Sequence, residues 1–272
     1  MSGQSPVSAI IALGCCRDED KNELAIKSHG KREFRILIPG QSEFFEFPDP
    51  RSANPEGVVA IGGVLSPVWV YSAYQQGIFP WPIDFGDEMV TAWFSPDPRA
   101  VFIWDRVHVP RRLARKLRSG RFTVTSDQAF DAVINACAGP RVIESVEEDG
   151  TWITTEMLAV YRELHLLGKA HSVEVWENDI LVGGLYGVAF GKIFAGESMF
   201  RRVSDASKIG LCTLLQHLQQ QGFALMDIQQ MTSHCESLGA VTVNREDYLE
   251  TLNSSLNQPA VFGVIDSQSL SW

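Results

Sequence analysis

Residues 171–200 constrain the fold of this chain more than any other part of the sequence. They hold three runs rich in apolar, β-branched and aromatic residues, at 171–176, 180–188 and 192–200, separated only by the short turns END and FG. Connections this short join antiparallel neighbours, because a parallel pair needs a crossover of a dozen or more residues. The sequence therefore predicts an antiparallel meander of three strands.

Helical patterns lie on both sides of this meander, with apolar residues recurring at intervals of three and four. The order of three helices, three strands, a helix and a strand is typical of an α+β (mixed α/β) domain with a largely antiparallel sheet. The expected elements are a helix at 110–118, a helix capped by Ser126, a helix that begins at Thr154, a helix at 206–221 ended by Gly222, a strand at 223–228 and a last helix at REDYLETL.

The N-terminal part of the chain has a different pattern of residues. Residues 1–43 are largely charged or lack a sustained period, and we interpret them as an extension that is flexible or weakly ordered. Residues 44–98 are dense in turn formers, with one short helix that Ser66 and Pro67 begin and Gly77 ends. We therefore expect a small N-terminal domain at 44–98, followed by a larger domain at 99–272.

Composition excludes several classes of protein. A chain of 272 residues with 45% hydrophobic content can bury a core, and a net charge of −10 argues against general nucleic-acid binding. The five cysteines form no C-x-x-C pair, and Cys137 and Cys212 fall at apolar helix positions, which favours core thiols in a reducing compartment. Since no run approaches eighteen apolar residues, we expect a cytoplasmic protein with no membrane segment.

A single carboxylate interrupts the apolar strand IFAGESMF. Alternation along a strand places Glu197 on one face with Ile193, Ala195 and Met199, and Phe194 on the other. A carboxylate on an apolar face costs several kcal/mol, roughly, unless it is paired or hydrogen-bonded. Three explanations remain open: the face is exposed to solvent, Glu197 pairs with an arginine, or Glu197 binds a cationic ligand.

A second polar pair follows in the segment FALMDIQQ. Asp227 and Gln229 are two residues apart, so alternation predicts that they point to the same side of the strand at its end. This is where α/β sheets commonly bind ligands, although a strand that simply runs into a polar loop gives the same pattern. Together with Glu197, these two residues would suit a site for an amine.

Basic residues gather in one short stretch of this acidic chain. Seven of its 23 basic residues lie from Arg106 to Arg121, and the single acid beside them is Asp105, directly before the stretch. Such a run is either the solvated face of a helix or a surface that contacts a phosphate backbone, and both interpretations remain open.

Other catalytic motifs are missing from the sequence. It contains neither a G-x-S-x-G elbow nor a phosphate-binding G-x-x-x-x-G-K-[ST] loop, and Ser207-Lys208 has the position of a helix cap. His165 and His171 lack the spacing of metal ligands. We expect no metal, no cofactor and no covalent catalysis.

Several segments, in order and at near-constant spacing, resemble one family. They cover most of the chain, from about residue 47 to residue 252, and resemble the leucyl/phenylalanyl-tRNA–protein transferases. The segments are GVVAIGGVL (57–65), AYQQGIFPW (73–81), WFSPDPRAV (93–101), GTWIT (150–154), HSVEVW (171–176), LVGGLYGVAFGKIFAGESMF (181–200), ASK (206–208), DIQ (227–229) and SLGA (237–240).

The resemblance implies a fold and a reaction. It implies a small N-terminal domain before an acyl-CoA N-acyltransferase-like (GNAT-like) domain. It also implies transfer of leucine or phenylalanine, less readily methionine, from aminoacyl-tRNA to the N-terminal Arg or Lys of a protein, which marks that protein for N-end-rule degradation. We expect a monomer that works without a cofactor.

The resemblance also implies roles for individual residues. Glu197, Asp227 and Gln229 match the polar active-site residues, and we hypothesise that Asp227 orients Gln229, which hydrogen-bonds the attacking amine, while Glu197 neutralises an ammonium. The aminoacyl pocket or the nearby adenosine site is implied for Trp81, Trp152, Leu185, Phe194, Met199 and Leu214. Contact with the tRNA acceptor stem is implied for Arg111, Arg112, Arg115, Lys116 and Arg118.

The chain departs from the family pattern at several positions. Arg201 stands where the family usually has Ser, Ile228 where it has Cys, and Phe94 where it has Trp. These changes leave the reaction intact, and with Leu185 and Leu214 they bear on the preference for leucine or phenylalanine. Two alternatives stay open: an acyl-CoA-dependent N-acetyltransferase, and a non-catalytic module that binds aminoacyl-tRNA.

Overall fold

The computed structural model describes residues 23–27, 33–37, 44–84, 89–139, 141–143, 146–148 and 153–265. The chain separates into two units, which we call unit 1 (residues 1–97) and unit 2 (residues 98–272). Each unit has its own sheet.

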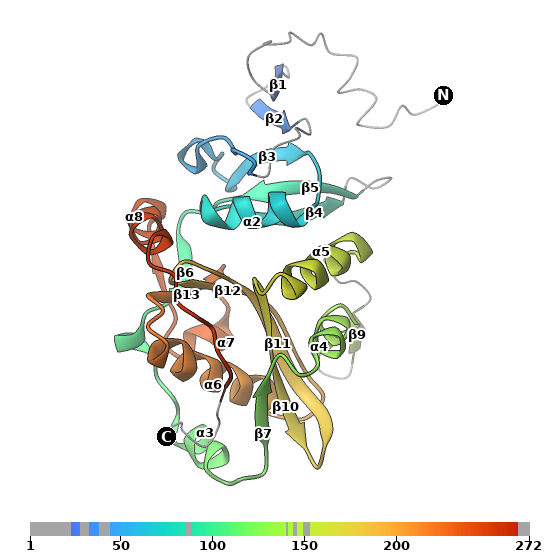
Figure 1. Cartoon of the computed structure of the whole chain (residues 1–272), viewed down its shortest axis with the longest axis vertical. Helices are drawn as coiled ribbons and strands as arrows, with labels where there is room; N and C mark the ends of the chain where they lie inside the picture. The colour runs from blue at the N-terminus through green and yellow to red at the C-terminus, as the bar shows by residue number, and fades with distance from the viewer. Residues whose placement is uncertain are drawn as a thin grey trace. The chain divides into compact units, whose positions relative to one another are not determined.

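Unit 1 holds a five-stranded sheet in the order β1-β2-β3-β5-β4 (Figure 1). Two of its strands fall in the segment that the sequence analysis assigned to an extension. The elements are β1 (Glu23–Lys27), β2 (Glu33–Leu37), the 3₁₀ helix η1 (Pro50–Ser52), β3 (Val58–Gly62), α2 (Pro67–Gln75), β4 (Phe79–Asp84) and β5 (Met89–Phe94).

The predicted short helix of unit 1 is confirmed with its cap. The Ser66 hydroxyl accepts a hydrogen bond from the Trp69 amide, and Pro67 occupies the first turn, where no amide is needed. The helix buries Trp69 against the rings of Phe45, at a centroid distance of 3.6 Å, and of Trp93, at 6.0 Å. This aromatic group forms part of the core of unit 1.

Unit 2 holds a seven-stranded sheet in the order β14-β6-β13-β12-β11-β10-β7, and only β12 and β13 are parallel neighbours. The predicted meander and the mixed α/β class are confirmed. Its elements are β6 (Arg99–Phe102), η2 (Trp104–Arg106), α3 (Arg111–Leu117), β7 (Thr123–Ser126), α4 (Phe130–Cys137), β8 (Arg141–Ile143), β9 (Val146–Glu148), α5 (Thr155–Leu166), β10 (Ala170–Glu177), β11 (Ile180–Phe190), β12 (Ile193–Arg201), α6 (Ala206–Gln220), β13 (Leu225–Gln229), α7 (Ser233–Glu236), β14 (Val241–Val243) and α8 (Arg245–Leu256).

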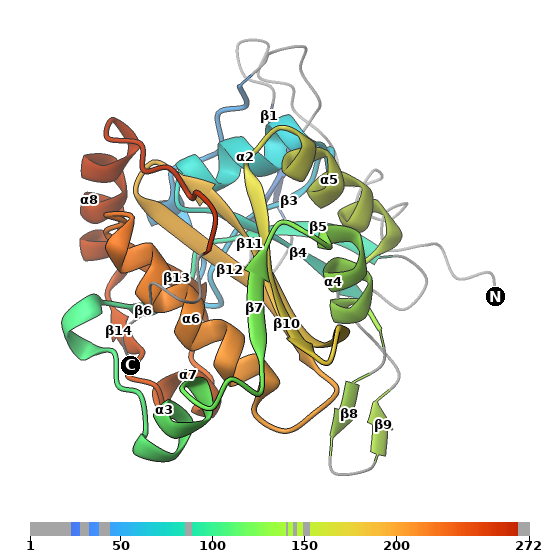
Figure 2. The ribbon, with the colours of Figure 1, turned by 60° about the horizontal axis from the view of Figure 1, so that its bottom comes forward.

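Helices cover both faces of the unit 2 sheet (Figures 1 and 2). On one face, which we call the α6 face, the helix α6 packs against Leu185 of β11. On the other, the α5 face, the neighbouring residue Tyr186 packs edge-on against Phe130 of α4 and Tyr161 of α5. The alternation of Leu185 and Tyr186 along β11 thus divides the core of unit 2 between two layers.

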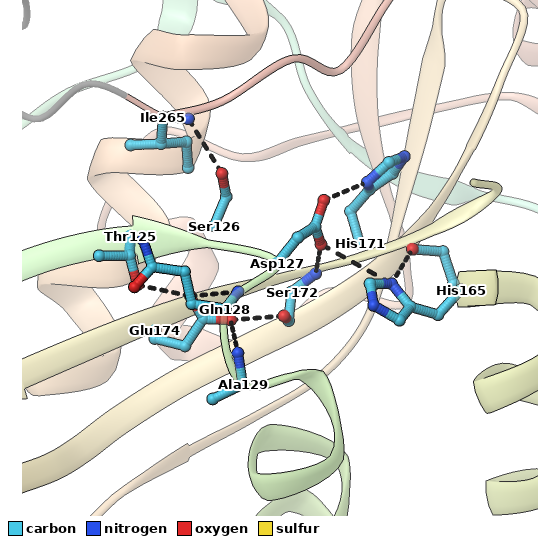
Figure 3. Close-up of polar contacts among 11 residues, drawn as sticks. Thr125, Ser126, Asp127, Gln128, Ala129, His165, His171, Ser172, Glu174 and Ile265 are labelled. Atoms are coloured by element: carbon cyan, nitrogen blue, oxygen red, sulfur yellow. Dashed lines mark hydrogen bonds and ion pairs between the residues drawn. The ribbon is translucent and has the colours of Figure 1, made fainter.

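One predicted cap is wrong. Ser126 does not cap α4 but ends the edge strand β7, where it pairs with Val173 and its hydroxyl accepts a hydrogen bond from the Ile265 amide. The backbone amide at the start of α4 donates instead to the buried carboxylate of Glu174. This carboxylate accepts hydrogen bonds from the Ala129 amide and the Thr125 hydroxyl (Figure 3). A carboxylate from another strand is invisible to a local capping pattern.

A second carboxylate fixes the turn between β7 and α4. Asp127 adopts a left-handed conformation, with φ of 56°, and its side chain accepts a hydrogen bond from the Ser172 amide at 2.8 Å. Its other oxygen lies 2.7 Å from Nδ1 of His171 (Figure 3). The ring of His171 stacks on Phe262. This network ties the C-terminal segment to the edge of the sheet.

None of the helices in the described part of the chain is both long and apolar enough to cross a membrane.

The buried thiols give a test of the packing. Cys137, Cys212 and Cys235 are free and buried, and burial raises the pKa of the Cys212 thiol to about 12. At pH 8 such a thiol carries on the order of a thousandfold less thiolate than an exposed cysteine. We expect iodoacetamide to modify Cys212 at least ~100-fold more slowly in the folded protein than in guanidinium, measured by peptide mass spectrometry. Equal rates in both conditions would refute this packing.

Candidate active site

The site forms around an irregularity in β12. Residues 198–201 and 193–196 both pair with β11, but Tyr186 is opposite Ser198 and the next residue, Gly187, is opposite Gly196. Glu197 is therefore the extra residue of a β-bulge. A bulge breaks the alternation of faces and re-aims the side chain that it contains.

The bulge corrects the predicted faces of the strand. Met199 does not share a face with Glu197, because it packs with Phe194 against the core on the α6 face. The Glu197 carboxylate instead reaches the α5 face, where its Oε2 accepts a hydrogen bond from the Tyr161 hydroxyl at 2.8 Å. Simple alternation fails here because it counts the bulge residue as an ordinary strand residue.

Glu197 is half-buried and receives a second neutral donor. The Nε2 of Gln229 donates to its Oε1 at 3.3 Å. Burial first and the nearby charge of Glu197 second raise the pKa of Tyr186 well above its ordinary value. The carboxylate is thus held in a partly desolvated position, where the Tyr161 hydroxyl and the Gln229 amide orient its two oxygens.

Gln229 reaches Glu197 from an unusual backbone conformation. Its φ is 58°, in the left-handed region, and its backbone amide donates to Oδ1 of Asp227 at 2.9 Å. The pairing of β13 with β6 skips one residue between Asp227 and Gln229, so the predicted alternation does not describe this strand end. The two residues are joined by a hydrogen bond across a turn instead.

Asp227 is fully buried and forms an ion pair with Arg99. The Nε of Arg99 donates to Oδ1 at 2.9 Å and its Nη2 to Oδ2 at 2.7 Å, while the Tyr248 hydroxyl donates to Oδ2 at 2.9 Å. Burial by itself lowers the pKa of the Arg99 guanidinium, but Asp227 and Tyr248 outweigh it, and the pKa is raised. Burial and then the charge of Asp227 raise the pKa of Tyr248 well above its ordinary value.

The proposed pocket residues fall into three groups. Leu185, Phe194 and Leu214 are fully buried on the α6 face. Met199 packs against the same cluster and is half-buried. Trp81 lies on β4 in unit 1. Trp152 lies outside the described residues. The structure thus gathers four of the six on one side of β11 and β12.

The basic helix α3 presents most of its charges to solvent. Leu113 is buried, while Arg111, Arg112, Arg115 and Arg118 are exposed. Lys116 differs from these, because its ammonium forms an ion pair with Asp205, directly before α6.

That ion pair has an electrostatic consequence. The hydrogen bond from Lys116 lowers the pKa of Asp205, and the charges of Lys116, Lys208 and Arg112 lower it further. Asp205 has a left-handed backbone, with φ of 70°, and its side chain does not cap α6. The pair therefore holds α3 against the start of α6.

Sequence reasoning missed three polar partners of the site. Arg99 stands within the quoted segment WFSPDPRAV, but nothing in the pattern connects it to Asp227, 128 residues later. Tyr161 and Tyr248 lie at apolar helix positions, and only their buried hydroxyls show a polar role. A tyrosine in a buried stripe was the one available signal, since a buried hydroxyl usually has a partner.

In the described part of the chain, no group of three or more His, Cys, Asp or Glu residues is placed to hold a metal ion.

Comparison with known proteins gives the class and then the family. The chain matches aminoacyltransferases along most of its length: the family model described as leucyl/phenylalanyl-tRNA protein transferase matches residues 101–253, and the model of that family's N-terminal domain matches residues 63–97. With these matches and the relatives below, the chain belongs to the leucyl/phenylalanyl-tRNA–protein transferase family.

Curated relatives of this name are close in sequence. The protein from Pseudomonas aeruginosa (strain LESB58) is 49% identical over 217 residues, which are 79% of this chain and 93% of the relative. The protein from Shewanella baltica (strain OS223) is 48% identical over 219 residues, covering 80% of this chain and 90% of the relative. Among solved structures, L-PGS from Bacillus licheniformis is similar at a TM-score of 0.37 and 11% identity, covering 81% of this chain and 70% of that chain.

The left-handed turn at Gln229 can be tested by comparing two substitutions. Alanine at this φ keeps the strain of a Cβ atom, whereas glycine removes it. We expect Gln229→Gly to be more stable than Gln229→Ala by about 1 kcal/mol in the free energy of unfolding, measured with urea. Both should lose transfer activity, because both lack the amide. An alanine variant as stable as the glycine variant would contradict the turn.

Proposed function

We propose that this enzyme transfers leucine or phenylalanine, and less readily methionine, from aminoacyl-tRNA to the N-terminal Arg or Lys of acceptor proteins. The product then carries an N-terminus that leads to N-end-rule degradation. The single observation that carries this proposal is the half-buried Glu197 carboxylate at the β12 bulge, which the Tyr161 hydroxyl and the Gln229 amide orient. A partly desolvated carboxylate attracts a cationic group more strongly than a carboxylate in bulk water does.

The reaction is the aminolysis of an ester, which is already downhill. The nitrogen of the acceptor α-amine forms a bond to the aminoacyl carbonyl carbon, and the bond from that carbon to the ribose oxygen breaks. The α-ammonium has an ordinary pKa near 8 and loses one proton before attack. The nitrogen loses a second proton as the amide forms, and the leaving ribose oxygen gains one. Most of the acceleration then comes from holding amine and ester together, which contributes on the order of 7–11 kcal/mol.

Glu197 and Gln229 suit the binding of the amine. A carboxylate accepts hydrogen bonds only, so the amide nitrogen of Gln229 faces Glu197, and its amide oxygen points away. An ammonium that belongs to the aminoacyl ester or to the acceptor can therefore be neutralised by Glu197, while the Gln229 oxygen accepts a hydrogen bond from the attacking amine. An amide is a poor base, so Gln229 orients the amine without taking its proton.

Apolar residues support the preference for the amino acid. On the resemblance to the family, we place Leu185, Phe194, Met199 and Leu214 in the lining of the aminoacyl pocket. They form one apolar cluster on the α6 face, opposite the Glu197 carboxylate, and Leu185, Phe194 and Leu214 are fully buried in it. Such a lining accepts leucine, phenylalanine and methionine and disfavours charged side chains; a misfit methylene costs about 1–3 kcal/mol. We extend the lining to Trp81 and Trp152, which match family positions.

The exposed arginines of α3 support binding of the tRNA. Arg111, Arg112, Arg115 and Arg118 project from one short helix in a chain of net charge −10, which concentrates positive potential locally. Lys116 contributes by fixing α3 through Asp205. We further propose a monomer that works in the cytoplasm and a GNAT-like fold for residues 99–272, supported by the meander followed by α6 and the parallel strand β13.

Transfer of label tests the proposed acceptor. We expect radiolabelled leucine and phenylalanine to pass from charged tRNA to a peptide that begins with Arg or Lys and not to the same peptide beginning with Ala. Glu197→Gln keeps the shape and removes the charge, so it should lower kcat/KM by about 100-fold, as an ion pair of about 2.7 kcal/mol in a desolvated site would require. Binding of charged tRNA without transfer to any peptide would instead indicate a non-catalytic module.

Two donors separate the role of α3 from that of the site. Arg112→Glu with Arg115→Glu should raise KM for aminoacyl-tRNA and reduce the salt dependence of binding by about 0.7–0.9 per lost phosphate contact. The same variant should react normally with a minimal aminoacyl-adenosine, which has no acceptor stem. Arg112→Glu is also made alone, and Lys192→Glu, at the turn between β11 and β12, is its control, since both change the net charge by −2. Equal loss with both donors would show that α3 has only a structural role.

A further inference from the structure

The hydrogen-bonding capacity of Asp227 is full. A carboxylate has about four acceptor sites, two on each oxygen. Oδ1 accepts from Arg99 Nε and the Gln229 amide, and Oδ2 accepts from Arg99 Nη2 and the Tyr248 hydroxyl. With the side chain fully buried as well, Asp227 has no acceptor site left for an amine or a ribose hydroxyl.

The buried Arg99–Asp227 pair is not explained by stability. Desolvation of two charges opposes their burial, and a protein with well-packed apolar residues in place of a buried ion pair is often equally or more stable. What a bidentate pair supplies that apolar packing does not is direction, because two parallel hydrogen bonds fix the plane of the carboxylate. The ring of Tyr248 lies under the guanidinium, 4.5 Å from its carbon, and restrains the pair from a third side.

The fixed plane aims Oδ1 at the Gln229 backbone. The Gln229 amide donates to this oxygen from a left-handed conformation, which is strained for a residue with a Cβ atom. If Oδ1 moved, the turn would relax toward ordinary φ values, and the Gln229 side chain would swing away from Glu197. The conformation that joins Gln229 to Glu197 thus depends on a contact two residues upstream.

We propose that Arg99 and Tyr248 are positioning residues for the transfer reaction. They hold the Asp227 carboxylate so that it locks the left-handed turn at Gln229, and Asp227 itself acts through that turn without touching either substrate. This inference rests on the proposed function, since it assigns the residues that set the geometry of the amine-binding pair.

The Tyr248 hydroxyl gives the mildest test. Tyr248→Phe keeps the ring under Arg99 and removes one hydrogen bond to Asp227. We expect kcat for leucine transfer from charged tRNA to the Arg peptide to fall about tenfold, with KM changed less than twofold, as expected for a lost hydrogen bond to a charged group. The neighbour Leu249→Ala on the same helix is the control: it removes buried apolar volume and no bond to Asp227.

The control separates positioning from packing. Leu249→Ala should lower Tm at least as much as Tyr248→Phe and keep kcat within twofold of wild type. If both variants lose kcat in proportion to Tm, or if Tyr248→Phe keeps full kcat, the proposal is wrong. A wild-type protein that transfers nothing to the Arg peptide would overturn the proposed function instead, and the two failures are therefore distinct.

A charge-free pair tests whether Asp227 must be ionised. Arg99→Gln or Asp227→Asn alone leaves a buried charge without its partner, and we expect kcat to fall about 100-fold in each. The double variant removes both charges, while Asn keeps an oxygen that can accept from the Gln229 amide. We expect it to regain at least about tenfold over either single variant, with a pH–rate profile of unchanged shape. No recovery, or a shifted profile, would show that the Asp227 charge takes part in proton transfer.

Discussion

The parallel pairing of β12 with β13 is the interaction on which the site depends. It places Ala195 beside Asp227, the last pair of the ladder, and Glu197 and Gln229 each follow two residues later. A parallel neighbour requires a crossover, and α6 provides it across the face opposite Glu197. The Glu197–Gln229 pair, the helix that connects its strands and the apolar cluster under that helix are consequently parts of one folding unit.

Two acidic residues that look alike in the sequence have different environments in the fold. Both are acids near strand ends with apolar neighbours, and the resemblance assigned both to the active site. Asp227 is saturated by Arg99, Tyr248 and the Gln229 amide, whereas the two donors to Glu197 described above are neutral. Saturation of its oxygens and full burial, more than residue type, therefore distinguish the Asp227 carboxylate from the half-buried Glu197 carboxylate.

The periodic parts of the fold could be predicted from the sequence. Short turns between apolar runs predicted the meander, and the spacing of the leucines in α6 predicted a buried helix. These patterns are reliable because they are repeated over many residues. The departures could not be predicted. Each β-bulge adds one residue to a strand, and contacts with residues far away in the sequence stabilise it. The cap of α4 likewise comes from Glu174 on another strand. The predicted cap at Ser126 and the predicted face of Met199 failed for this reason: a local pattern contains no information on tertiary hydrogen bonds.

The net charge of the chain and the charge near α3 have opposite signs. A net charge of −10 repels a phosphate polymer on average, but the field near a surface follows the nearest charges, since screening limits the range to about 8–10 Å. The arginines of α3 lie on a helix that packs against α6 and is tied to it by Lys116 and Asp205. Because α6 also connects β12 to β13, a phosphate backbone bound at α3 would be held by the element that positions Glu197 and Gln229. Binding energy from the nucleic acid can in this way contribute to the orientation of the ester, even though no charge of α3 takes part in the chemical step.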